Sequence, residues 1–350
     1  MDSQEQILER VRAALAAKSP LALQGGNTKA FYGYPAQGEA LDLSEHSGVI
    51  EYDPGELVMT CRAGSRLADI RGLLAGNRQH LPFEPPGFGE QATIGGTVAC
   101  GFSGPGRPWN GSLRDYLLGV KIINGRGEEL VFGGQVMKNV AGYDVSRLMA
   151  GSMGTLGVIL EASFKVLPMP ARELTLEFEC NQDEAIQRIS QWSAQPLPLS
   201  AASWRQDRLL VRLSGAVSQV EKAAEMLAPD KITDSQEHWL KLREQQDPFF
   251  QDDGPLWRLS LPAATAPLDL AGDCLLDWGG AQRWYVSTES AERVQAAAEA
   301  AAGNASLFCG EAETGRFHPL PPAMQELQKR VKQAFDPHGL FNPFRMSRDW

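Results

Sequence analysis

The stretch from Pro85 to Asp115 reads PPGFGEQATIGGTVACGFSGPGRPWNGSLRD, and its centre is Thr93-Ile94-Gly95-Gly96-Thr97. A loop rich in glycine lets backbone N–H groups approach a ligand closely. Consecutive N–H groups in such a loop form a concave anion site, which suits phosphate or pyrophosphate. The hydroxyls of Thr93 and Thr97 would add two donors. The alternative is that the glycines serve only tight turns in a β-rich region.

A second glycine-containing turn lies nearer the start of the chain. The apolar segment 21–23 is typical of a short strand, and it runs directly into Gln24-Gly25-Gly26-Asn27-Thr28-Lys29. A strand that ends in Gly-Gly-Asn-Thr is a second candidate phosphate loop, and a plain turn is the alternative. Neither stretch is a nicotinamide fingerprint, because Gly-x-Gly-x-x-Gly between a strand and a helix is absent from both.

Composition excludes several classes of protein. The 350 residues suffice for two domains, and a content of 43% hydrophobic and 22% charged residues is typical of a globular protein. The formal net charge of -10 argues against a nucleic-acid partner. The five cysteines are scattered and include no C-x-x-C pair, which predicts reduced thiols rather than a disulfide framework, a zinc site or an iron–sulfur cluster.

The N-terminal segment and the hydropathy of the chain bear on location. Residues 1–15 are acidic and amphipathic, unlike a secretory signal peptide. No apolar run reaches the roughly 18 residues that a membrane span requires. These features predict a cytoplasmic protein.

Glycine usage divides the chain. Residues 1–157 contain 26 glycines and residues 158–350 contain 9. We place the boundary near Pro168-Met169-Pro170, because two prolines end a strand there. In the first part, segments 49–52 and 57–61 flank the turn Asp53-Pro54-Gly55 and predict a hairpin, and segments 117–123 and 130–132 predict another.

The second part has the pattern of a conventional α+β domain. Strands are expected near 175–180, 199–205, 208–213, 256–261, 274–278, 282–287 and 306–308, and helices at 183–192, 217–227, 237–245 and 291–301. This order resembles the split β-α-β type of small domain. A last helix, 324–335, is expected to place Met324, Leu327, Val331 and Phe335 on one face.

Six short motifs occur in an order that resembles the FAD-binding family of p-cresol methylhydroxylase and vanillyl-alcohol oxidase. The motifs are Gly25-Gly26-Asn27-Thr28, Thr93-Ile94-Gly95-Gly96-Thr97-Val98-Ala99, Gly111-Ser112-x-x-Asp115, Lys138-Asn139-x-x-Gly142-Tyr143-Asp144, Gly151-Ser152-x-Gly154-Thr155-Leu156-Gly157-Val158-Ile159 and Asp336-Pro337-x-Gly339-x-x-Asn342-Pro343. Within that family, the short chain and the segments 104–109, 134–138 and 277–280 resemble the FAD-binding subunits of multi-subunit glycolate oxidases.

The resemblance implies an α+β fold. It consists of a PCMH-type FAD-binding domain of two α/β subdomains over residues 1–170 and a smaller ferredoxin-like α+β cap domain over residues 171–320. Residues 321–350 form a C-terminal helix and tail that return to the FAD domain. The cofactor-binding residues that the resemblance implies are Gly25, Gly26, Asn27, Thr28, Thr93, Ile94, Gly95, Gly96, Ala99, Gly101, Ser112, Gly157, Val158, Ile159 and Asn342.

The implied activity is the oxidation of glycolate by a complex in which this chain carries non-covalent FAD. The partners would be a longer FAD-linked glycolate oxidase subunit and an iron–sulfur subunit, which passes electrons toward quinone. The complex would lie in the cytoplasm and contact the inner face of the cell membrane only peripherally. Alternatives are a stand-alone FAD-dependent 2-hydroxy-acid dehydrogenase and a structural subunit without flavin.

Departures from the family pattern leave the catalytic residues unidentified and imply no metal ligands. Related dehydrogenases carry a His-x-Gly-Asp-Gly-Asn-x-His motif that is absent here, and residues 24–31 lack the histidine that attaches flavin covalently. Lys138 and Arg345 are candidate cations beside a flavin, with a solvated surface charge as the favoured alternative. Arg258 and Arg283 are candidates for a substrate carboxylate, with a surface or structural arginine as the favoured alternative. Phe344 replaces the glycine that usually follows Asn-Pro in the tail.

Overall fold

The computed structural model describes residues 3–134, 144–234, 236–311 and 315–350. The expected motif around Lys138, Asn139, Gly142 and Tyr143 therefore lies outside the described residues. The chain divides into two compact units. Unit 1 contains residues 1–103, 112–168 and 320–350, and unit 2 contains residues 104–111 and 169–319.

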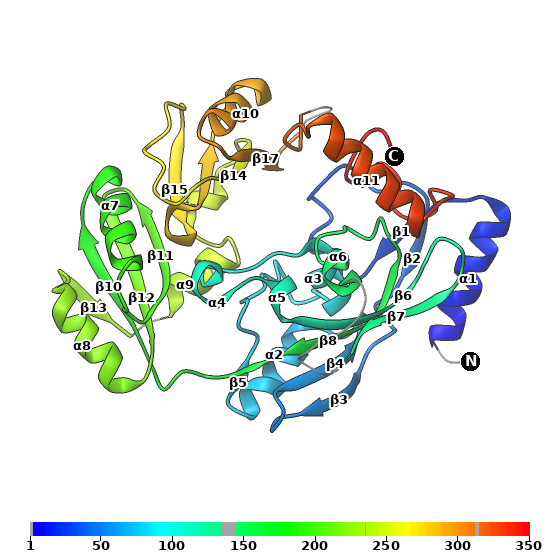
Figure 1. The fold of residues 1–350 in the computed structure, drawn as a ribbon, viewed down its shortest axis with the longest axis horizontal. Helices are drawn as coiled ribbons and strands as arrows, with labels where there is room; N and C mark the ends of the chain where they lie inside the picture. Colours follow the sequence, from blue (N-terminus) through cyan, green and yellow to red (C-terminus); the bar gives the residue numbers. More distant parts are fainter. Residues whose placement is uncertain (1–2, 135–143, 235, 312–314) are drawn as a thin grey trace. The chain divides into compact units, whose positions relative to one another are not determined.

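The main sheet of unit 1 has five strands in the order β3-β4-β8-β6-β7 (Figure 1). Their bounds are Val49–Asp53 (β3), Val58–Arg62 (β4), Leu117–Ile123 (β6), Glu129–Gly133 (β7) and Val158–Lys165 (β8). All neighbouring strands in this sheet are antiparallel. The two hairpins expected from the turns near Pro54 and Gly125 are confirmed as β3–β4 and β6–β7.

A bulge in β8 lets this strand contribute side chains to two hydrophobic cores. The pairing of β6 with β8 shifts register between Lys121 and Ile122, opposite Leu160. A bulge adds one residue on one strand and reverses the alternation of side chains beyond it. Val158 and Leu160 accordingly pack in the core beneath α1, whereas Ile159 and Ala162 belong to the larger core.

A second, smaller layer of unit 1 consists of two parallel strands, β1 (Leu21–Gln24) and β2 (Glu39–Asp42). The C-terminal tail extends this layer, because Phe341 forms a parallel bridge with Leu21. Helix α1 (Ser3–Ala17) packs its buried Ile7 and Val11 into the same core. Segments from the two ends of the chain therefore form one layer.

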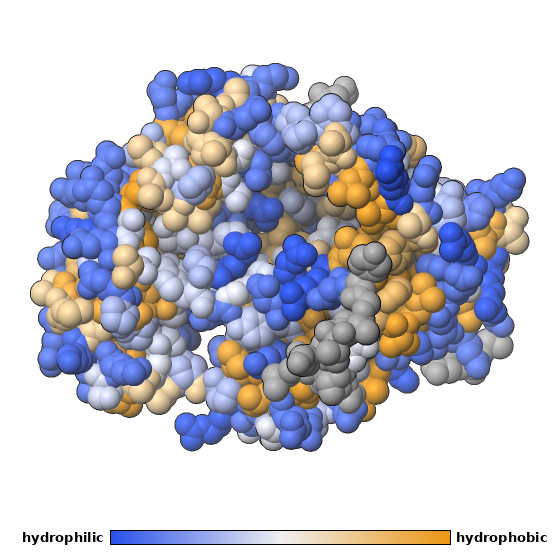
Figure 2. Space-filling model, viewed as in Figure 1, coloured by the Kyte–Doolittle hydropathy of each residue, from blue (hydrophilic) through white to orange (hydrophobic). Residues whose placement is uncertain are grey.

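The remaining elements of unit 1 are short except for two helices. They are α2 (Leu67–Gly76), β5 (Gln79–His80), α3 (Ile94–Cys100), α5 (Leu113–Tyr116), α6 (Val145–Met149), β9 (Leu167–Pro168) and α11 (Pro322–Phe335). Helix α11 packs only Val331 and Phe335 on the larger core. Met324 and Leu327 are exposed, so only the part of this face near the end of the helix packs on the core. Figure 2 shows apolar residues at the surface over α11.

Unit 2 is built on one eight-stranded sheet in the order β13-β10-β12-β11-β15-β16-β14-β17. The strands are β10 (Arg172–Glu179), β11 (Leu199–Arg205), β12 (Arg208–Gly215), β13 (Lys231–Thr233), β14 (Leu256–Ser260), β15 (Asp273–Asp277), β16 (Gln282–Val286) and β17 (Asn304–Cys309). The helices are α4 (Arg107–Asn110), α7 (Gln182–Ser193), α8 (Val217–Leu227), α9 (Glu237–Arg243), η1 (Pro248–Gln251), η2 (Trp278–Gly280) and α10 (Ala291–Ala300).

The sheet of unit 2 contains the split β-α-β pattern twice. Strands β10 to β13 lie in the order 4-1-3-2 of a ferredoxin-like unit, and β14 to β17 repeat that order. The two halves meet at their second strands, where Trp204 on β11 pairs with Leu276 on β15. The fold class expected from the sequence is confirmed, although the sequence indicated one ferredoxin-like unit and the structure contains two.

The second half of unit 2 has a loop in place of its first helix. Between β14 and β15, residues 261–272 run without regular structure. The fully buried Arg283 donates hydrogen bonds to the backbone carbonyls of Thr265, Ala266 and Gly280. Arg283 therefore anchors this loop. Its donors are directed at main-chain oxygens, so the structural alternative holds for Arg283 and the carboxylate clamp does not.

Within the described residues, no helix is long and apolar enough to span a bilayer. Over the same residues, no group of three or more His, Cys, Asp or Glu side chains could hold a metal ion.

Candidate functional site: an elongated cavity in unit 1

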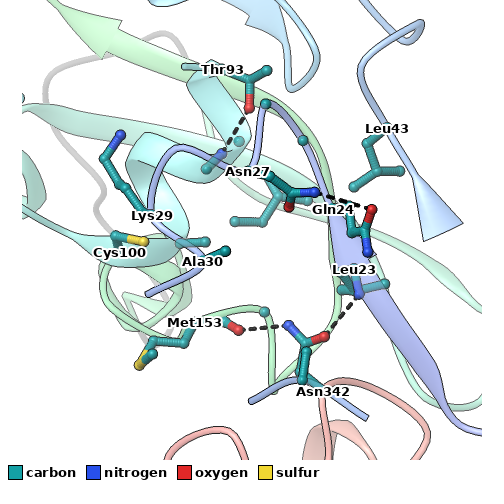
Figure 3. A pocket seen from close by; sticks show the side chains of 18 of the residues that line it. Leu23, Gln24, Asn27, Lys29, Ala30, Leu43, Thr93, Cys100, Met153 and Asn342 are labelled. Carbon is teal, nitrogen blue, oxygen red and sulfur yellow. Dashed lines mark hydrogen bonds between the residues drawn. The ribbon is translucent and has the colours of Figure 1, made fainter. Parts of the chain in front are cut away.

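The two glycine-containing stretches line one cavity of about 370 Å³ in unit 1 (Figure 3). Eleven of the fifteen residues expected to bind a cofactor line it, namely Gly25, Gly26, Asn27, Thr28, Thr93, Gly95, Gly96, Ala99, Gly157, Ile159 and Asn342. The cavity thus joins the loop after β1, helix α3, the start of β8 and the C-terminal tail. These segments lie up to about three hundred residues apart in the chain.

The first loop needs glycine because it lies against the second stretch. A Cβ atom on Gly26 would lie 1.5 Å from the carbonyl oxygen of Gln91, and one on Gly25 would lie 2.4 Å from Thr93 Oγ1. Gly26 therefore accepts no side chain unless the two segments separate, and Gly25 accepts one only if the Thr93 side chain moves. The next residue, Asn27, adopts the left-handed region with φ of 53°, which asparagine tolerates better than most residues.

The first loop presents unpaired backbone amides. Among the described residues, no protein acceptor takes a hydrogen bond from the backbone N–H groups of Gly25, Gly26, Asn27 or Thr28. Four successive free donors at the wall of a cavity form the kind of concave site that binds a phosphate oxygen. The loop thus offers the free donors that a phosphate loop needs, and the binding of a ligand by these residues stays a prediction.

The second stretch is built differently from the expected open loop. Residues 94–100 form the helix α3, and Thr93 is its N-cap residue, accepting a hydrogen bond from Gly96 N at 3.2 Å. Ile94 N donates to Ser65 O at 2.9 Å, and Gly95 N donates to Ala63 O at 2.7 Å. The first amides of α3 are therefore already bonded, so this stretch offers the cavity a small-residue wall rather than free donors.

The two threonines of this stretch also differ. Thr93 lines the cavity, and its hydroxyl hydrogen remains available because its oxygen acts as the acceptor for Gly96 N. Thr97 is buried, and its hydroxyl donates to Thr93 O at 2.8 Å. The expectation that both hydroxyls would serve a ligand is therefore wrong for Thr97.

Four of the residues expected at the site lie away from the cavity lining. Ile94 and Val158 are fully buried in the two cores of unit 1. Gly101 ends α3 in the left-handed conformation, with φ of 66°. Ser112 N and Oγ both donate to Asp115 Oδ2 and so form the start of α5. Each of these residues has a structural reason for its type.

Lys29 and Cys100 also line the cavity, and of the two only Cys100 was considered beside a flavin from the sequence, with a small buried residue as the favoured alternative. Lys29 is buried at the cavity wall, where its Nζ donates to Gly87 O at 3.1 Å and lies 5.6 Å from the centroid of the Phe88 ring. Burial raises the pKa of the Cys100 thiol, and the charges of Lys29 and Arg345 act in the opposite direction. The position of Lys29 directly after Gly-Gly-Asn-Thr could have indicated from the sequence that this lysine lines the cavity.

The charged residues among the described lining of the cavity are both basic. Lys29 and Arg345 line it, and the described lining residues include no aspartate or glutamate. In a chain with a formal net charge of -10, this is a local reversal of sign. An anionic ligand is therefore favoured at this site over a neutral or cationic one.

The tail contributes Asn342 through two hydrogen bonds. Its side-chain Nδ2 donates to Met153 O at 2.8 Å, and its Oδ1 accepts from Leu23 N at 2.8 Å (Figure 3). Asn342 adopts φ of 41°, and Phe344, where the family pattern has glycine, adopts φ of 63°. The amide of Asn342 thus connects the end of β1 to the turn before β8.

A buried ion pair supports the tail from behind. Lys332 Nζ lies 2.7 Å from Asp336 Oδ2 and also donates to Thr155 O and Phe341 O. Asp336 accepts from the backbone N–H groups of Leu340 and Phe341. Desolvation lowers the pKa of Lys332, and the charge of Asp336 opposes that shift. Every polar group of the pair therefore has partners, as a buried pair requires.

Comparison with known proteins places this chain in a family. An FAD binding domain family matches residues 1–133. The glycolate oxidase subunit GlcE of Escherichia coli (strain K12) is 47% identical over 345 residues, which cover 99% of this chain and 97% of that protein. The chain belongs to the GlcE family of glycolate oxidase subunits. Its first unit accordingly contains an FAD-binding domain.

More distant relatives match part of the GlcE-family chain. The glycolate oxidase subunit GlcD of Bacillus subtilis (strain 168) is 31% identical over 55% of this chain and 42% of its own length. Among solved structures, an alkyldihydroxyacetonephosphate synthase superposes with a TM-score of 0.65 at 14% identity, covering 98% of this chain and 76% of that one. This structural match shows that the two chains share a fold.

The residues of this GlcE-family cavity fit FAD. Four free amides, the Thr93 hydroxyl and the Lys29 ammonium are donors suited to a diphosphate. Gly95 and Gly96 have no side chain and Ala99 has only a methyl group, so this wall leaves room for a ligand. Within the described lining there is no histidine and no carboxylate, so a general base for the substrate was not identified from the structure either.

Proposed function

We propose that this chain holds one non-covalent FAD in the unit 1 cavity and acts as the FAD-carrying subunit of a complex that oxidises glycolate to glyoxylate. The observation that carries the proposal is the cavity itself, with its four free amides and two cations, in a chain that matches E. coli GlcE over 97% of that protein. FAD would supply the acceptor for the two electrons removed from the substrate.

The protein would bind and orient the cofactor with its own groups. The amides of Gly25 to Thr28 would donate to the diphosphate, and Lys29 would neutralise its charge. The small residues of α3 would lie against the ligand, while Ile159 would cover its apolar part. Ile94, Gly101, Ser112 and Val158 would act only through the packing that holds these elements in place.

The names of the relatives imply that the chain works with other subunits, and the identity of those subunits is part of the proposal. We propose a longer FAD-linked glycolate oxidase subunit and an iron–sulfur subunit, which would carry electrons toward quinone at the inner face of the cell membrane. The division of labour is supported by the existence of a GlcD-named relative that shares only about half of this chain. Unit 2, residues 171–320 in the sequence-based division, would be the cap of the FAD domain.

The test is a flavin count on the chain alone and on the complex. We expect the chain alone to take up one FAD that acid precipitation releases, and the complex to hold one FAD more than the longer subunit does by itself. A chain that stays colourless after incubation with FAD, alone and in the complex, would favour a flavin-free structural subunit. Glycolate-dependent dye reduction by the chain alone would favour a stand-alone dehydrogenase instead.

A further inference from the structure

The C-terminal tail, residues 336–350, holds the first loop on both of its sides. Before the loop, Asn342 Oδ1 accepts a hydrogen bond from Leu23 N at 2.8 Å. After the loop, Arg345 donates to Tyr34 O at 2.7 Å, to Ala30 O at 3.0 Å and to Lys29 O at 3.4 Å. The four free amides, residues 25–28, lie between these two anchor points.

The contact after the loop is made by backbone as well as side chain. Tyr34 N donates to Arg345 O at 3.1 Å, and Gly33 approaches so closely that a Cβ atom would lie 2.9 Å from that same oxygen. Gly33 has φ of 81° and Asn27 has φ of 53°. Residues 25–36 contain no helix or strand, and their own backbone bonds are the turns from Ala30 N to Asn27 O and from Tyr32 N to Lys29 O, so contacts with the tail add to a small number of internal ones.

We propose that Arg345 is a positioning residue for the cofactor loop: its guanidinium group fixes residues 29–34 from the tail, and the free amides of Gly25 to Thr28 are thereby held in one orientation before any ligand binds. A loop that is ordered in advance loses less conformational entropy on binding, so affinity rises. The identity of the ligand rests on the proposed function, whereas the ordering of the loop does not.

This role differs from that of a simple cation beside the ligand. Arg345 lines the cavity, so its charge alone could attract an anion. A lysine would keep that charge but could not span three carbonyl oxygens with a planar fork of donors. Arg345→Lys therefore separates the two roles, because a charge role survives the substitution and a positioning role does not.

The experiment measures two quantities on the full chain freed of flavin. The first is the dissociation constant for FAD. The second is backbone hydrogen exchange over residues 27–36 without FAD. The variants are Arg345→Lys and Arg345→Met, and the control is Arg330→Met, which removes an exposed arginine that pairs with Glu326 on the same helix. Arg345→Gln serves as a second neutral variant if Arg345→Met does not fold.

We expect both Arg345 variants to raise the dissociation constant about 10- to 100-fold, the size expected for losing hydrogen bonds to a charged donor. We expect faster exchange over residues 27–36 in the flavin-free Arg345 variants. Exchange in α2 of these variants, and exchange throughout the Arg330→Met control, should stay as in the original chain. Unchanged exchange, or an Arg345→Lys variant with the original affinity, would overturn the proposal. If the original chain takes up no FAD, the proposed function fails, and the exchange data still decide the role of Arg345.

Discussion

Gly26→Ala is the substitution for which the structure gives the sharpest expectation. Its new Cβ atom would lie 1.5 Å from the carbonyl oxygen of Gln91, whereas ordinary contacts begin at 3.4 Å. The two segments would have to separate by about 2 Å, and both groups in conflict belong to the backbone or are fixed to it. Overpacking of this kind costs about 3 kcal/mol, which is more than a hundredfold in the folding equilibrium.

Two matched substitutions calibrate this expectation. Gly72→Ala lies inside α2 with open space around the new methyl group, so it should raise the free energy of unfolding by about 0.5–1 kcal/mol. Gly25→Ala meets the hydroxyl of Thr93 at 2.4 Å, and because that side chain can rotate, the cost should fall between the other two.

The assay combines urea unfolding of the flavin-free chain with a titration by FAD. Gly26→Ala should lower the free energy of unfolding and abolish or strongly weaken FAD binding, because the first loop would leave the wall of the cavity. Gly72→Ala should bind FAD as the original chain does. A Gly26→Ala protein with original stability and affinity would refute the inference that the two segments are in contact.

Three further outcomes follow from other parts of the molecule. Asn342→Asp keeps the backbone conformation but places a carboxylate oxygen against Met153 O. It should therefore lower the free energy of unfolding by about 1–3 kcal/mol in urea titrations at neutral pH. An unchanged free energy of unfolding would contradict the hydrogen bond from Asn342 to Met153. Burial lowers the pKa of His238 from 6.5 to about 4, so the folded chain binds a proton at this imidazole less readily than the unfolded chain does. The free energy of unfolding should therefore rise between pH 4 and 6.5, by up to about 3 kcal/mol. A His238→Gln variant with the same pH dependence would contradict that assignment. Alkylation followed by peptide mass spectrometry should label the exposed Cys309 and spare Cys61, which is buried and whose pKa is raised to about 12; equal labelling would show that the core opens.

Local patterns in the sequence were enough to predict the hairpins, and the family resemblance supplied eleven of the residues that line the cavity. A turn signal between two apolar segments fixes an antiparallel pair through local geometry, and β3–β4 and β6–β7 follow it. The approach of the two glycine stretches was predicted from motif order. The close contacts of Gly25 and Gly26 give the physical reason why glycine stands at both positions.

The hydrogen bonds of α3 could not be predicted in this way. Glycine content suggests exposed amides, but whether an amide is free depends on which distant carbonyl lies opposite it. Gly95 N meets Ala63 O, which β4 and the segment after it carry into place. The spacing of glycines within residues 93–97 does not indicate that Ala63 O lies opposite Gly95 N. A pair of glycines therefore accompanies free donors in the first loop and a close-packed helix, α3, in the second stretch.

The doubled architecture of unit 2 was hidden for a similar reason. The second half lacks the helix that would mark a repeat, because the loop anchored by Arg283 stands in its place. The meeting of β11 with β15 joins two edges that are about seventy residues apart. Such pairing depends on tertiary packing, which the alternation of apolar and polar residues does not encode.

The return of residues 320–350 to unit 1 has a consequence for how the chain is made. Residues 169–319 are synthesised after the first loop and before Asn342 and Arg345, and at about 5–20 residues per second this takes on the order of 10 s. During that interval β1 lacks its neighbour from the tail, and the edge of a parallel pair stays open to solvent and to other nascent chains. The wall of the cavity is therefore complete only after residues 320–350 have been made, and we expect truncation of these residues to disturb the loop after β1.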